Sequence, residues 1–81
     1  MEIRIHFYSY FRDLTGCAET TITVPPGRTM SDLLNDMIRR FPKLGAMQNS
    51  TLTAVGVEYQ GRGYVLQEGD EVSLFPPVQG G

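Results

Sequence analysis

The last six residues of the chain could serve chemistry, and they read Pro76-Pro77-Val78-Gln79-Gly80-Gly81. Each proline fixes its own φ and moves the preceding residue away from helical geometry, so this tail is expected to be extended. Glycine has no Cβ, and the carboxylate of Gly81 could therefore enter a slot too narrow for any other residue. The tail 76–81 is a candidate reactive handle, with the terminal carboxylate as the reacting group. The alternative is a frayed terminus without a role.

Two other side chains could take part in chemistry. His6 could shuttle a proton or bind a metal. No second histidine or nearby cysteine accompanies it, so we expect a solvent-facing residue on a strand. Cys17 would need a base or a positive environment to react. Arg12 is the only candidate nearby in the sequence, and we interpret Cys17 as an incidental thiol. No metal site is predicted.

Composition bounds the class of protein. The chain has 81 residues, of which 41% are hydrophobic and 20% are charged, and its formal charge is −2. These values predict one small globular domain spanning residues 1–81. The absence of a basic run argues against nucleic-acid binding, and no apolar stretch approaches the length of a membrane span. One cysteine cannot form an internal disulfide, which favours a cytoplasmic location.

The first third of the chain reads as two strands. Residues 2–8 alternate, so that one face carries Tyr8 and the other carries Ile3, Ile5 and Phe7. A short helical turn over 10–14 would end at Gly16. Residues 19–24 are rich in Thr, Ile and Val, and they predict a second strand in an antiparallel hairpin with the first.

An amphipathic helix is predicted after Pro25-Pro26-Gly27. Thr29 is a suitable N-cap, and Asp32 stands at the third helical position, where a capping box would have Glu. An apolar stripe follows at helical spacing: Met30, Leu33, Leu34, Met37, Ile38 and Phe41. Pro42 ends the helix. We expect the stripe to pack against a sheet.

The remainder of the chain predicts short elements: a loop at 43–50, strands at 52–57 and 64–66, a turn at 67–70 and a last strand at 71–75. In the last strand Val72 and Leu74 share a face, so Phe75 lies on the opposite one. An outward Phe75 beside an outward Tyr8 could form a docking patch.

The order of these elements predicts an α+β protein. A hairpin cannot bury its face alone, and the helix supplies the missing layer. A last strand beside the first and parallel to it would complete a mixed sheet of four to five strands, with one main helix on one face. We expect this β-grasp (ubiquitin-like) fold.

The segment Leu66–Gly81, with its Gly-Asp-Glu-Val, Phe-Pro-Pro-Val and Gly-Gly strings, closely resembles the C-terminal signature of one protein family. This is the MoaD branch of the MoaD/ThiS ubiquitin-like sulfur carriers, the small subunits of molybdopterin synthase. Residues 7–16 are similar to the family's opening strand and turn. One departure is Val55-Gly56-Val57, where the family usually has Val-Asn, and it leaves the placement of Tyr59 open.

The resemblance implies a sulfur carrier that is a non-catalytic subunit of a transferase and binds no cofactor itself. An E1-like (MoeB-like) enzyme would use ATP to adenylate Gly81, and a sulfur donor would convert the adenylate to a thiocarboxylate. The tail would then deliver sulfur to the pterin precursor in a MoaE-like large subunit, in molybdenum cofactor biosynthesis. The family's docking positions match Tyr8, Arg12, Tyr59 and Phe75. Arg12 could equally be structural, bonding a nearby carbonyl or acid.

Three alternatives remain at this point. A ThiS-type carrier for thiazole synthesis would have the same terminal chemistry. A ubiquitin-like modifier would be conjugated through Gly81 to lysines of other proteins; only Lys43 and the α-amino group could accept another copy. A β-grasp interaction module with an inert tail is the third.

Overall fold

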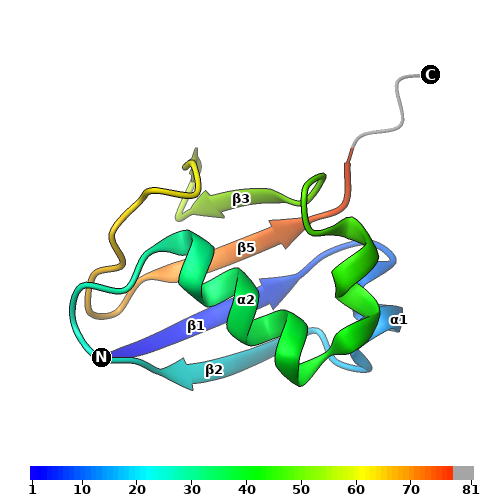
Figure 1. Cartoon of the computed structure of the whole chain (residues 1–81), viewed down its shortest axis with the longest axis horizontal. Helices are drawn as coiled ribbons and strands as arrows, with labels where there is room; N and C mark the ends of the chain where they lie inside the picture. Colours follow the sequence, from blue (N-terminus) through cyan, green and yellow to red (C-terminus); the bar gives the residue numbers. More distant parts are fainter. Residues whose placement is uncertain (78–81) are drawn as a thin grey trace.

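The computed structural model describes residues 1–77, which form a five-stranded mixed sheet with a helix across one face (Figure 1). The strand order is β2-β1-β5-β3-β4. The strands are β1 (Glu2–Phe7), β2 (Glu19–Thr23), β3 (Leu52–Val55), β4 (Glu58–Tyr59) and β5 (Glu71–Phe75). Strand β1 pairs antiparallel with β2 and parallel with β5, and β3 pairs antiparallel with β5 and β4. The expected α+β class and β-grasp fold are confirmed.

Helix α2 (Met30–Arg40) begins at the predicted cap. The Thr29 hydroxyl accepts a hydrogen bond from the Asp32 N–H at 3.3 Å, and Asp32 Oδ2 accepts one from the Thr29 N–H at 3.0 Å. Together they form a capping box, although Asp stands in place of Glu. The hydrogen bond from the Thr29 backbone lowers the pKa of the Asp32 carboxyl, because it stabilises the charged form.

The core lies between α2 and the sheet. The buried apolar side chains of the helix are Met30, Leu33, Leu34 and Met37, and those of β1 and β5 are Ile3, Ile5, Phe7, Val72 and Leu74. Phe7 also meets Phe41 edge to face, with ring centroids 5.5 Å apart. Each such side chain contributes about 1.5–3 kcal/mol when fully buried. This core fixes one face of the sheet and leaves the other uncovered by α2 (Figure 1).

Three short elements differ from the prediction. The segment expected to be a loop contains the 3-10 helix η1 (Pro42–Met47). The third strand ends at Val55 rather than at residue 57, because Gly56 turns the chain at φ +59° and the unpredicted β4 pairs back on β3. Helix α1 (Phe11–Thr15) does end at Gly16, which has φ +77°.

The strand predicted at 64–66 is wrong. Val65 makes only an isolated bridge with Thr29, and the backbone on either side bonds to the loop before α2. The Met30 N–H donates to the Tyr64 carbonyl, and the Leu66 N–H donates to the Arg28 carbonyl. The Tyr64 hydroxyl donates to Asp70 Oδ2 at 2.9 Å, and this bond raises the pKa of Tyr64.

No helix within residues 1–77 is long and apolar enough to cross a bilayer.

Candidate partner-docking site

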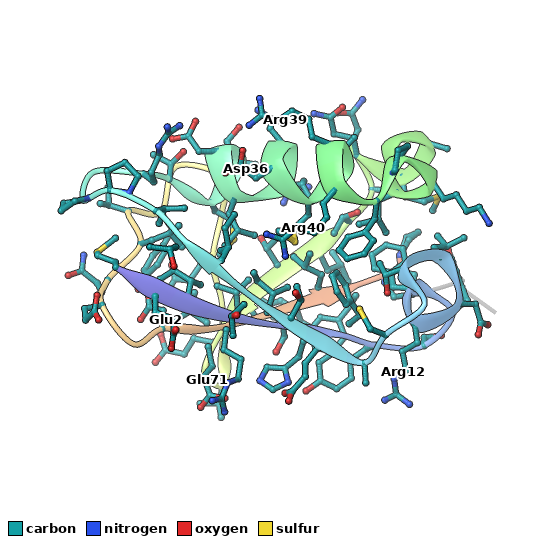
Figure 2. All side chains as sticks on the ribbon, turned by 90° about the horizontal axis from the view of Figure 1, so that it is seen from below. Glu2, Arg12, Asp36, Arg39, Arg40 and Glu71 are labelled. Atoms are coloured by element: carbon teal, nitrogen blue, oxygen red, sulfur yellow. The ribbon has the colours of Figure 1, made fainter. Side chains whose placement is uncertain are left out.

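The sheet face opposite α2, here called the outer face, carries the candidate docking residues. The register of the strands determines which residues lie on this face, because paired residues in neighbouring strands project to the same side. Ile5 and Phe7 pair with Val72 and Leu74 and point to the helix. The alternate residues therefore point away, and Figure 2 shows Glu2, Arg12 and Glu71 on the side of the sheet opposite α2.

An aromatic row crosses the outer face at the end of β5. The rings of Tyr8 and Phe75 stack, with centroids 4.7 Å apart and planes tilted by 14°. Tyr59 meets the other side of Phe75 edge to face, at 6.3 Å and 60°. Tyr59 comes from β4, on the far side of β3, and its side chain is 71% exposed. The structure thus joins three of the four predicted docking residues in one surface.

Arg12 extends this row at the Tyr8 end. Its guanidinium carbon lies 5.9 Å from the centre of the Tyr8 ring, within the range of a cation–π contact. Its Nε donates to the Phe7 carbonyl at 3.2 Å, which is the structural role that the sequence left open. The residue is nevertheless exposed, so the same side chain both braces the end of β1 and contributes a positive charge to the surface. We call Arg12, Tyr8, Phe75 and Tyr59 the docking row.

A groove of about 440 Å³ adjoins the docking row where the tail begins. It is lined by Ser9, Tyr10, Leu52, Tyr59, Phe75, Pro76 and Pro77. Ser9 has a φ of +56°, a strained value for a residue other than glycine, and it turns the chain between Tyr8 and Tyr10. Sequence reasoning missed Ser9, Tyr10 and Leu52. The alternation of the third strand held the signal for Leu52, which pairs with Phe75.

His6 lies on the outer face, as expected, but it is not free in solvent. Its side chain is 26% exposed and sits between two carboxylates. Nε2 lies 3.0 Å from Glu71 Oε1 on β5, and Nδ1 lies 3.4 Å from Glu19 Oε2 on β2. The imidazole therefore links the two strands that flank β1.

Cys17 is half-buried against the edge of the core. Its Sγ lies 3.7 Å from the Thr15 hydroxyl. Within residues 1–77, no three His, Cys, Asp or Glu side chains gather closely enough to hold a metal ion.

The C-terminal tail, residues 76–81, is described only at its root. Pro76 and Pro77 follow β5 directly and are half-buried beside the docking row. Val78, Gln79, Gly80 and Gly81 lie outside the described residues, so their predicted roles remain predictions. A contiguous aromatic surface lies at the base of the tail.

Comparison with known proteins identifies the family. The ThiS family model matches residues 5–81. The chain belongs to the ThiS family. The molybdopterin synthase sulfur carrier subunit of Arabidopsis thaliana is 30% identical over 100% of this chain and 84% of its own length. The protein of the same description from Homo sapiens is 31% identical over 99% of this chain and 94% of its own.

A solved structure agrees with this ThiS-family assignment. The putative molybdopterin converting factor, subunit 1, from Pyrococcus furiosus superposes with a TM-score of 0.87 and 27% identity. The match covers 96% of this chain and 99% of the other. The expected family membership is therefore confirmed from both sequence and fold.

Proposed function

We propose that this ThiS-family chain is the sulfur-carrier subunit of a molybdopterin synthase. The observation that carries the proposal is the continuous path from the docking row through Phe75 into Pro76 and Pro77. A partner that covers the row would receive the tail at a fixed position. Full-length relatives described as molybdopterin synthase sulfur carrier subunits support the same function.

The chemistry would take place at Gly81. A carboxylate is a poor electrophile, and transfer of an adenylyl group from ATP, with release of pyrophosphate, turns it into an acyl-adenylate with a good leaving group. Sulfur from a donor then displaces AMP and leaves a thiocarboxylate. Its sulfur is the atom delivered to the pterin precursor. The six residues from Pro76 could reach about 20 Å when extended, because an extended chain spans about 3.3–3.6 Å per residue.

The docking row would supply the affinity. Aromatic and arginine side chains dominate the free energy of many protein interfaces, and the row contains three aromatic rings and Arg12. Tyr59 is largely exposed in the free chain, so a partner that covers it would remove apolar surface from water.

Two partners are implied, an E1-like adenylating enzyme that consumes the ATP and a large subunit that holds the pterin. The carrier would bind no cofactor itself and would act in the cytoplasm. The donor of the sulfur is a third partner.

Intact-mass measurement tests this function. The full chain is incubated with ATP, the activating enzyme and a sulfide source, and a parallel sample lacks ATP. We expect a gain equal to the difference between one sulfur and one oxygen atom, only when ATP is present. An unchanged mass with an activating enzyme that loads a known carrier would contradict the proposal.

A second step separates molybdopterin synthesis from thiazole synthesis. The thiocarboxylated chain is mixed with either a molybdopterin synthase large subunit and its pterin substrate or a thiazole synthase and its substrates. We expect sulfur to be consumed only in the first mixture. Consumption only in the second would assign the chain to the other pathway.

A further inference from the structure

His6 is held by both neighbouring strands in a way that depends on its protonation state. Both ring nitrogens face carboxylate oxygens, with Nε2 3.0 Å from Glu71 and Nδ1 3.4 Å from Glu19. A neutral imidazole carries one N–H, so it can donate to only one of these groups, while its other nitrogen presents a lone pair to the second. The imidazolium carries two N–H groups and satisfies both. The arrangement thus matches the charged ring.

Few other groups near His6 could compensate the negative charges of Glu19 and Glu71. Along β1 on the same face stand Arg4 and Tyr8, and the Tyr8 ring centre lies 6.5 Å from that of His6. From β2 and β5 the facing charged groups are Glu19 and Glu71. Arg4 pairs in register with Glu71, but the described structure contains no ion pair of Arg4 within 4.0 Å. Arg12 lies over the Tyr8 ring, with its guanidinium carbon 5.9 Å from the ring centre.

The cluster of His6, Glu19 and Glu71 adjoins the docking row. Tyr8 is the nearest aromatic neighbour of His6 and also stacks on Phe75. A partner that covers Tyr8 would therefore approach His6 and withdraw water from the two carboxylates. With neutral His6 the three groups carry a charge of −2, and with protonated His6 they carry −1. Loss of solvent is less costly for the smaller net charge, and it strengthens the attraction between the ring and its partners.

We propose that His6, bridged between Glu19 and Glu71, makes the docking face proton-sensitive, so that binding of the large subunit takes up a proton at this ring. The inference rests on the proposed function and adds its regulation. By linkage, a proton taken up on association makes binding strengthen as pH falls, and one linked proton limits the change to at most about tenfold per pH unit.

The test is calorimetric titration of the full-length carrier into the large subunit at about pH 6, 7 and 8, at constant ionic strength. Repeating each titration in buffers of different ionisation enthalpy counts the protons taken up. We expect uptake of up to one proton and a several-fold gain in affinity toward low pH in the native chain. His6→Gln, which cannot titrate, should lose that increment, and His6→Arg, which is charged throughout, should lose the same increment.

Glu71→Gln serves as a second variant, because it removes one carboxylate and leaves the histidine in place. It should reduce the proton uptake. Histidines of the partner contribute equally to all variants, so the difference from the native chain isolates His6. An identical pH dependence in the native chain and in His6→Gln would overturn the inference while leaving the proposed function intact. Failure of the native chain to bind the large subunit at any pH would overturn the proposed function and this inference with it.

Discussion

Tyr8, just past the end of β1, stacks on Phe75, the last residue of β5, with ring centroids 4.7 Å apart. The contact follows from the parallel pairing of the two strands, which places their ends side by side on the outer face. Residue 76 begins the tail. The stack therefore ties the orientation of the tail's root to the surface that a partner would cover.

Truncation of the stack should weaken partner binding. Phe75→Ala or Tyr8→Ala removes a ring from the centre of the docking row, and an interface anchor of this kind typically contributes about 2 kcal/mol or more. That loss corresponds to roughly 30-fold in Kd. Titration against the large subunit measures it. Val65→Ala is the matched control, because Val65 is 46% exposed but lies in the loop beside Thr29. Equal affinity of all three variants would refute docking through the outer face.

Arg12 should show its two roles separately. Arg12→Met removes the bond to the Phe7 carbonyl and the contact with Tyr8, and each contributes about 0.5–1.5 kcal/mol in comparable sites. Arg12→Lys keeps the charge but not the geometry of the Nε bond. We expect Arg12→Met to lower both the melting temperature and the affinity for the large subunit. Relative to Arg12→Met, Arg12→Lys should restore more of the affinity than of the stability. Affinity losses that simply track melting temperature in both variants would show that Arg12 is only structural.

The capping box of α2 should make the stability of the fold depend on pH in the acidic range. The pKa of Asp32 is lowered in the folded chain from its ordinary value of 3.8. Its contribution to the free energy of unfolding is therefore fully present above that value. The contribution is lost as pH falls through the lower, folded value. Asp32→Asn should therefore melt below the native chain at neutral pH, and the gap should shrink below about pH 4. Thermal unfolding across this range checks it, and a gap that grows in acid would contradict the assigned cause.

Sequence patterns revealed the elements whose signals are local. The cap at Thr29 and the apolar stripe predicted α2, and alternation predicted β1, β2 and β5 together with the outward placement of Tyr8 and Phe75. The hairpin of β3 and β4 was missed because its turn at Gly56 and Val57 falls inside the stretch read as one strand, and the region is also held by a side chain later in the sequence. Arg62 donates to the carbonyls of Gln48 and Thr51 and to the Thr53 hydroxyl. No periodicity in a four-residue strand records such contacts.

In the docking site, too, some residues had a local signal in the sequence and others did not. Tyr59 and Arg12 were identified only through resemblance to the family, because neither position follows from alternation. Tyr10 and Ser9 were missed as part of the groove, since their placement depends on the positive φ of Ser9. A short polar turn in the sequence gives no warning of that conformation.

The three hydrogen bonds donated by Arg62, here called the Arg62 brace, give a further prediction. Arg62→Met would leave two backbone carbonyls and one hydroxyl without their donor, and loss of such bonds at a half-buried site costs roughly 1–3 kcal/mol. Denaturant unfolding should show this loss. Arg39→Met is the control, because Arg39 is exposed and, among residues 1–77, pairs only with Asp36 one turn away. Equal stability of the two variants would mean that water replaces the brace at no cost.

The central claim is that the terminal carboxylate of Gly81 is the loaded group and that the folded body serves to present it. The most direct measurement is molybdenum cofactor production in cells that lack the native carrier and express the chain without Gly81. We predict no cofactor, with protein abundance and melting temperature unchanged, because the core and the docking row lie within residues 1–77. Restoration of cofactor production by the shortened chain would contradict the account.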